Sequence, residues 1–250
     1  LVISTYENTI PGTAVTHLAN ILFLGLEPMF DSPNYEIAYI ITCIGVIQVC
    51  FVPANVTALF IILVGYIEAQ ISALTIEMVN LWPDAEELYA NITNDKSIKL
   101  NAFVKKRLQD IIARHGTVIM LLRRLENVYR VVIAVEFMLL VIGVIFELLG
   151  GLENTYMEIP YAFMQVFMDC LTGQRLLEAS LAFEKAVYFC NWENFDNGNR
   201  KTTVMILLCS QRSLTLSAGG VTVLTYSSFL GIVRSVYSAY ATLSRVVHEV

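Results

Sequence analysis

The chain has 250 residues, of which 56% are hydrophobic and 15% charged, and its mean hydropathy is +0.62. Soluble domains of this size carry about 25% charged residues, so this composition is that of an integral membrane protein. A net charge of −6 without a basic stripe argues against nucleic acid as a partner.

The sequence contains none of the short motifs that mark common catalytic sites. There is no G-x-S-x-G, no H-E-x-x-H and no glycine-rich phosphate loop. The five cysteines form no CxxC pair and the three histidines are far apart, so neither set has the spacing of metal ligands. We therefore predict reduced thiols and a protein that is not an enzyme and uses no cofactor or metal.

The N-terminal part of the chain leads into a first long apolar helix. We interpret residues 1–36 as the end of an earlier span followed by an extracellular loop. Residues 37–67 carry no charge, and as a helix they would measure about 46 Å, more than one hydrocarbon thickness of about 30 Å. This predicted transmembrane helix must therefore tilt or extend beyond the bilayer.

Residues 68–130 are predicted to form helical extensions outside the membrane. Apolar residues recur there at alternating steps of three and four, interleaved with charges. The first stripe contains Val64, Ile67, Ile71, Leu74, Met78 and Leu81, and the second contains Val104, Leu108, Ile111, Val118, Leu122, Leu125 and Tyr129. Trp82 and Pro83 follow the first stripe, and they predict a loop with a short helix between the two stripes. The stripes fit either packing against partner helices of other subunits or an intramolecular hairpin.

Two further membrane helices follow. Residues 131–150 form an apolar span that contains Glu136 and Glu147, and an acidic loop at 151–159 separates it from a long helix at 160–190. Residues 191–201 have the composition of a turn, with Asn and Gly near their centre. We expect that turn to lie in the cytoplasm.

The C-terminal region is predicted to form an anchor helix at 202–218 and a pore-lining helix at 219–246. It has no charge from 213 to 233, which is long enough for a span, yet it contains Gly219, Gly220 and a series of hydroxyl side chains. Small polar groups on a spanning helix either pack against another helix or line water. We favour the second interpretation.

The distribution of basic residues predicts the orientation. Nine of the sixteen Lys and Arg lie between 96 and 130, and none lies in 1–95 or in 131–174. By the positive-inside rule, residues 68–130 are cytoplasmic, whereas 1–36 and 151–159 are outside. The last helix then runs outward, and the C-terminus is extracellular.

Four segments resemble the insect odorant receptor family. They are LEPMFDSPNYEIAY, RHGTVIMLLRRLENVY, FMDCLTGQRLLEASLAFEKAVYFCNW, and MILLCSQRSLTLSAGG followed by SSFLGIVRSVYSAYATL. The resemblance covers roughly residues 25–246 and is most specific in the last part. It implies an all-α, heptahelical membrane protein with inverted topology and a cytoplasmic helical anchor, of which this chain lacks most of helices one to three.

The resemblance also implies a function. Because the connection between the fourth and fifth helices is short, the chain is more similar to an odour-tuned subunit than to the co-receptor. Such a subunit binds a small volatile odorant and opens a non-selective cation channel in a heterotetramer with co-receptor subunits, in the plasma membrane of the olfactory neuron dendrite. The alternative is a membrane transporter of a small solute, for which charges within spans would be expected.

The family places the ligand site in the outer halves of the helices before the last one. In this chain the corresponding positions are Tyr39, Ile40, Cys43, Ile44, Ile47, Leu140, Val144, Ile145, Tyr161, Met164, Phe167 and Met168. An apolar lining suits a small volatile compound. The same residues are also typical of plain core packing.

Four residues of the last helix are candidates for the pore wall. Ser235, Ser238, Thr242 and Val246 are spaced by three, four and four, so they share one helix face. Hydroxyls there would solvate a cation, and the resemblance puts Thr242 and Val246 near the extracellular gate. Helix packing through small residues is the alternative. Arg234 is expected to point away from the lumen or to pair with Asp169 or Glu136.

Overall fold

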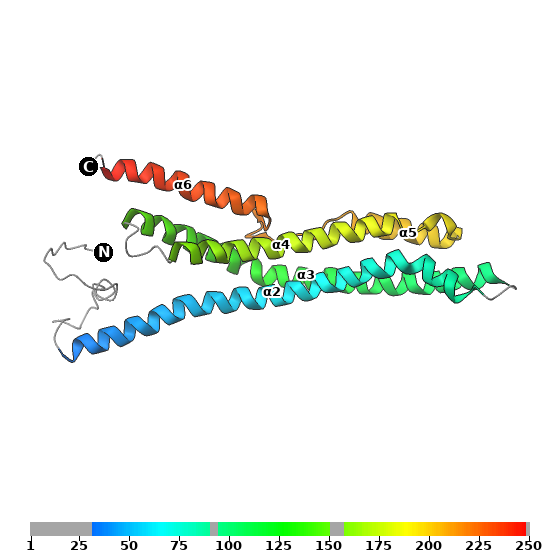
Figure 1. The fold of residues 1–250 in the computed structure, drawn as a ribbon, viewed down its shortest axis with the longest axis horizontal. Helices are drawn as coiled ribbons and strands as arrows, with labels where there is room; N and C mark the ends of the chain where they lie inside the picture. Colours follow the sequence, from blue (N-terminus) through cyan, green and yellow to red (C-terminus); the bar gives the residue numbers. More distant parts are fainter. Residues whose placement is uncertain (1–31, 91–94, 151–157, 249–250) are drawn as a thin grey trace. The chain divides into compact units, whose positions relative to one another are not determined.

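The computed structural model describes residues 32–90, 95–150 and 158–248 of the chain. The helices are α2 (Asn34–Leu88), α3 (Lys96–Gly150), α4 (Glu158–Tyr188), the 3₁₀ turn η1 (Trp192–Asn194), α5 (Asn197–Ser210) and α6 (Tyr226–His248). A two-stranded hairpin, β1 (Ser217–Ala218) and β2 (Thr222–Val223), separates α5 from α6 (Figure 1). The chain divides within α2 into two compact units, 1–55 and 56–250, which are described separately.

The two apolar stripes are buried within the second unit. The first stripe on α2, from Val64 to Leu81, and the second on α3, from Val104 to Leu125, belong to one hydrophobic core. Phe183 on α4 and Ile206 on α5 complete that core. Because the chain covers these stripes itself, they are not the surface through which subunits would meet. Of the two interpretations, the structure therefore has the intramolecular packing.

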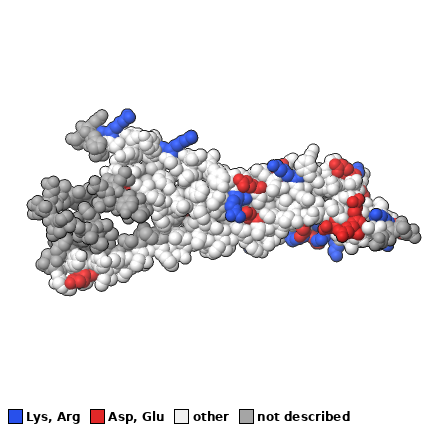
Figure 2. Space-filling view, viewed as in Figure 1, with Lys and Arg blue, Asp and Glu red and all other residues white. Residues whose placement is uncertain are grey.

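Among the residues that the structure describes, two long helices have the length and hydropathy needed to cross a bilayer. They are Phe51–Leu88 and Lys96–Leu149, and only 28% and 17% of their most apolar windows are buried in the chain. Most of this apolar surface is therefore available to lipid. On the face shown in Figure 2, charged side chains gather over α5 and the adjoining ends of α2 and α3.

The first helix is longer than predicted, because α2 continues through Pro83 to Leu88. Ala85 is fully buried, and the Trp82 ring lies 5.8 Å from the Phe195 ring beyond α4. These contacts hold the last turns as helix, although proline removes one backbone hydrogen bond there. Helix α2 thus continues through Leu88, into the segment for which a loop was predicted.

The predicted turn at 191–201 is partly helical. Asn191 adopts a left-handed conformation, with φ of 57°, and η1 follows it. Asp196 then caps α5, since its carboxylate accepts a hydrogen bond from the Asn199 N–H at 2.9 Å. Consequently α5 starts at Asn197, five residues before the predicted anchor helix.

The hairpin interrupts the region for which the sequence predicted a helix from residue 219. Gly219 and Gly220 have φ of +64° and +76°, a conformation that ends a right-handed helix at little cost only for glycine. Ser217 pairs with Val223 and Ala218 with Thr222 in an antiparallel register. The last helix therefore begins at Tyr226 rather than at 219.

Candidate ligand-binding and pore-lining sites

Leu140, Val144 and Ile145, the predicted ligand-binding residues of α3, belong to one apolar cluster near the end of that helix. Val144 of α3, Ala162 of α4 and Val236 of α6 are buried together. Leu140 and Ile145 pack against them, as do Phe163 and Ile232. The structure thus brings the α3 candidates into contact with the last helix.

The α4 candidates divide between the surface and the interface with α6. Tyr161 and Met164 are exposed, whereas Phe167 stacks against α6, with its ring 5.3 Å from Phe229 and 6.4 Å from Tyr226. Met168 is half-buried and accepts the hydroxyl of Thr172 at its carbonyl oxygen. Phe167 therefore links this group to the last helix directly.

The α2 candidates belong to the first unit and are described by themselves. Tyr39, Ile40, Ile44 and Ile47 are exposed, and Cys43 is half-buried. Ile40, Ile44 and Ile47 follow at steps of four and three, so they share one face of α2. Their role in ligand binding stays a prediction.

A buried polar cluster joins three helices within the apolar region. Gln165 of α4 donates from its amide to the Glu136 carboxylate of α3, and the Thr57 hydroxyl of α2 donates to the same oxygen at 3.4 Å. Asp169, one turn beyond Gln165, is 1% exposed, and neither of its oxygens has a hydrogen-bond partner among the described residues. Glu136 is therefore held by Gln165 and Thr57, which sequence reasoning missed because isolated uncharged polar residues in apolar runs have no characteristic spacing.

The candidate pore face of α6 points away from the rest of the unit. Ser235, Ser238 and Thr242 are exposed, whereas Val236 on the other side is buried. The Ser235 hydroxyl donates to the Gly231 carbonyl and that of Thr242 to the Ser238 carbonyl, each at 2.9 Å. These bonds keep the hydroxyl oxygens at the helix surface, where their lone pairs remain open. The side chain of Val246 lies outside the described part.

Arg234 is exposed on α6 and forms no ion pair with any carboxylate that the structure describes. The expected pairing with Asp169 or Glu136 is therefore absent from the described residues. Since 234 and 238 differ by four, the Cβ atom of Arg234 lies about 40° around the helix from that of Ser238. It stands beside the hydroxyl face, and not behind it.

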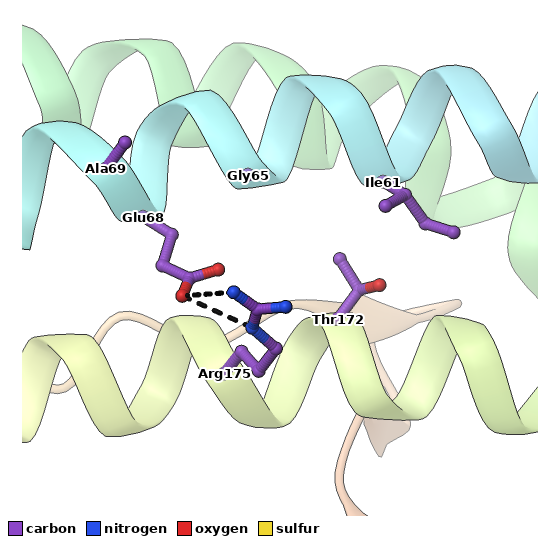
Figure 3. Close-up of a pocket in the computed structure, with 6 residues that line it drawn as sticks. All are labelled: Ile61, Gly65, Glu68, Ala69, Thr172 and Arg175. Atoms are coloured by element: carbon purple, nitrogen blue, oxygen red, sulfur yellow. Dashed lines mark hydrogen bonds and ion pairs between the residues drawn. The ribbon is translucent and has the colours of Figure 1, made fainter.

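A small cavity of about 170 Å³ lies between α2 and α4 (Figure 3). Arg175 crosses it to bind Glu68 through two nitrogens, at 3.0 and 3.2 Å. Gly65 leaves open space on the α2 side, because a Cβ there would meet no atom within 4 Å. Ligand sites usually measure about 300–1,000 Å³, so we interpret this cavity as the surroundings of an ion pair that joins two helices.

The hairpin is fixed to both α3 and α4. The Gly219 N–H donates to the Arg130 carbonyl at 2.8 Å, and the Ser217 hydroxyl donates to the Glu126 carboxylate at 2.7 Å. On α4, a Cβ at Gly173 would lie only 2.4 Å from the Leu224 carbonyl oxygen. The chain just before α6 is thus packed directly on α4. In the sequence, Gly173 was the residue that could have indicated this contact, because it leaves room for another backbone to approach.

Comparisons with known proteins point in one direction. Residues 16–237 match the family described as 7tm odorant receptor. The chain is 25% identical over 226 residues to odorant receptor 82a of Drosophila melanogaster, covering 86% of this chain and 54% of that protein. It is 25% identical over 243 residues to odorant receptor 10 of Aedes albopictus, covering 94% and 62%.

Matches to co-receptors are shorter. The odorant receptor coreceptor of Ooceraea biroi is 33% identical over 94 residues, which are 38% of this chain and 19% of that protein. Among solved structures, the olfactory receptor OR5 of Machilis hrabei in complex with eugenol has a TM-score of 0.72 at 15% identity. The match covers 87% of this chain and 55% of that one, and it shows a shared fold.

Proposed function

Because this chain belongs to the 7tm odorant receptor family, we propose that it is part of an odour-tuned receptor subunit. This subunit binds a small volatile compound among the outer parts of its helices and, with co-receptor subunits, opens a non-selective cation channel. The chain spans 54–62% of the two odorant receptors compared above, and the remainder would supply further walls of the ligand site.

This proposal rests on the observation that α6 has a buried apolar side and an exposed side with hydroxyl groups. One side, with Ile232 and Val236, packs in the apolar cluster that contains Val144 and the other α3 ligand candidates. The other side exposes Ser235 and the remaining hydroxyls. A ligand that changes the packing of the cluster would therefore act on the same helix that faces the ion path.

The longer matches to odorant receptors than to co-receptors support assignment to the odour-tuned subunit. For assembly we propose a heterotetramer that meets through α5. Val204, Met205 and Leu208 share one face of that helix and remain 53%, 67% and 63% exposed. We further propose that this region is cytoplasmic, that the C-terminus is outside, and that the protein resides in the plasma membrane of the olfactory neuron dendrite.

The structure lends no support to the alternative of a solute carrier. A carrier would be expected to hold charges within its spans, but Arg175 of α4 is paired with Glu68 across the α2–α4 cavity. It therefore has a structural partner outside the buried cluster of Glu136 and Asp169.

The test is electrophysiological. The full-length protein, co-expressed with a co-receptor, is exposed to a panel of odorants while whole-cell current is recorded. We expect odorant-evoked cation current with a reversal potential near 0 mV, as for a channel that does not discriminate among small cations (about equal permeabilities). Cells with the co-receptor alone are the control. Accumulation of the compound without current would contradict the channel proposal.

A further inference from the structure

A second cavity, of about 340 Å³, lies away from the ligand and pore candidates. One wall is α3, with Leu122 and Arg123, and the other is the connection from α5 to β1, with Arg212 and Leu214. We propose that this cavity binds the phosphorylated headgroup of an anionic membrane lipid, a phosphoinositide of the cytoplasmic leaflet. The assignment of the leaflet and the expected effect on odorant-evoked current rest on the proposed function, whereas the binding itself does not.

The position of the cavity along α3 fits a headgroup. Arg130 is the last basic residue before the apolar segment 131–150. Arg123 precedes it by seven residues, which is about 10 Å along a helix. The polar layers of a bilayer extend about 5–8 Å beyond the hydrocarbon on each side, so with Arg130 at the hydrocarbon boundary Arg123 lies just outside the layer of ordinary headgroups. Inositol phosphates project to this depth.

The charges in the cavity favour an anion. Arg123 and Arg212 approach from separate elements, and neither forms an ion pair with a described carboxylate. Glu126 also lines the cavity, but its carboxylate accepts the Ser217 hydroxyl at 2.7 Å. Two guanidinium groups against one carboxylate leave a net positive charge. Guanidinium groups bind phosphate through paired hydrogen bonds, so a phosphate fits the two arginines.

The remaining lining indicates a lipid and not a soluble anion. Ile119, Leu122 and Leu214 supply apolar surface beside the two arginines, while Ser213 and Thr215 supply hydroxyls. Basic pockets between membrane helices on the cytoplasmic side are typical sites for phosphoinositide headgroups.

Binding there would act on the last helix. The Leu214 N–H donates to the Ser180 hydroxyl at 3.0 Å, and the Leu224 N–H donates to the Leu216 carbonyl at 2.9 Å. A headgroup held by Arg212 would therefore restrain the connection that leads through the hairpin to α6. We expect the lipid to favour one position of α6 and so to change odorant-evoked current.

The first test measures binding with the full-length receptor complex. It is incubated with phosphatidylcholine vesicles that contain either phosphatidylinositol 4,5-bisphosphate or phosphatidylserine at equal total charge. We expect preference for the phosphoinositide, and at least about a tenfold loss of affinity in R123Q/R212Q from the loss of two charge-assisted contacts. R124Q is the matched control, since Arg124 is exposed on the same helix but does not line the cavity.

Several results would overturn the inference. Equal binding to both vesicles, or an equal loss in R124Q, would show general attraction between basic residues and an anionic surface. Competition by free inositol phosphates as strong as by the lipid would show a soluble anion as the ligand.

A second measurement does not depend on channel activity. The exposed thiol of Cys209 lines the same cavity, so bound lipid should slow its labelling by a maleimide, read by mass spectrometry of its peptide. We expect protection in the wild type and in R124Q but not in R123Q/R212Q. An unchanged labelling rate with the phosphoinositide would contradict occupancy of this cavity. If no odorant evokes current, the proposed function fails, yet labelling still decides on the lipid site.

Discussion

At the scale of single residues, Gly173 is the described glycine with the least room for a side chain. A Cβ there would lie 2.4 Å from the Leu224 carbonyl oxygen, whereas at Gly65 it would meet no atom within 4 Å. We expect Gly173→Ala to destabilise the fold by about 1–3 kcal/mol, and Gly65→Ala to be neutral or slightly stabilising because alanine favours a helix. Thermal unfolding of the purified receptor distinguishes them. Equal melting temperatures for both variants would contradict the close α4–α6 contact.

His115 gives a second prediction at this scale. It is buried against the Phe183 ring, 4.8 Å away, and burial lowers the pKa of its imidazole below the usual 6.5. The unfolded chain therefore takes up a proton near pH 6.5 that the folded chain accepts only at lower pH, so stability falls as the pH decreases below about 6.5. We expect the wild type to melt at a lower temperature at pH 5.5 than at pH 7.5. His115→Gln should flatten this dependence, and an unchanged slope in that variant would exclude His115 as its source.

At the scale of elements, α6 should separate two kinds of functional effect. Thr242→Val removes a hydroxyl from the exposed face, so we expect altered relative permeability to cations and an unchanged order of odorant potency. Val144→Ala removes about two methylenes from the apolar cluster, about 1.6 kcal/mol of apolar burial, and should change the order of potency by up to about tenfold for individual odorants. Dose–response curves and reversal potentials measure both. Similar effects of the two variants would contradict the division of α6 into two sides.

The elements also show which kinds of structure the sequence predicts. The alternating spacing of Val64 to Leu81 predicted a long amphipathic helix, and the structure buries these residues together in the core. The break after Ser210 was not predicted as a hairpin, because the uncharged run from 213 to 233 has the length of a span. Backbone conformation at Gly219 and Gly220, and their contacts with Arg130, decided the outcome there. Such contacts between distant segments leave no periodic pattern.

The site was less predictable than the helices for the same reason. The resemblance gave Val144 and Phe167, which do lie near α6, but Tyr161 and Met164 share their composition and are exposed. The type of a residue determines its affinity for an apolar environment. It does not determine whether the side chain lies on the buried or the exposed side of its helix. Thr57, which donates a hydrogen bond to Glu136, lies 79 positions away in the sequence, and no local pattern around either residue predicts this hydrogen bond.

At the scale of the whole molecule, the exposed face of α5 should determine assembly. Because the heptad stripes are buried within the chain, Met205 and Leu208 offer apolar surface that a partner subunit would cover. We expect Met205→Glu with Leu208→Glu to reduce co-purification with the co-receptor by at least about tenfold, since a buried unpaired charge is costly. Val221→Glu, at a 90% exposed position of the hairpin, is the control. Equal co-purification of all variants would exclude α5 as the contact.

The hairpin has a mechanical consequence for this assembly. A continuous helix from residue 197 to 248 would transmit every rotation of its outer half to its inner half, because its backbone hydrogen bonds resist torsion. Here the φ angles of Gly219 and Gly220 interrupt that rod, and α5 is covalently joined to α6 only through a short non-helical segment. We therefore expect residues 211–225 to take up the twist of α6 while α5 stays in place, so that the lifetime of the assembled complex is the same with and without odorant.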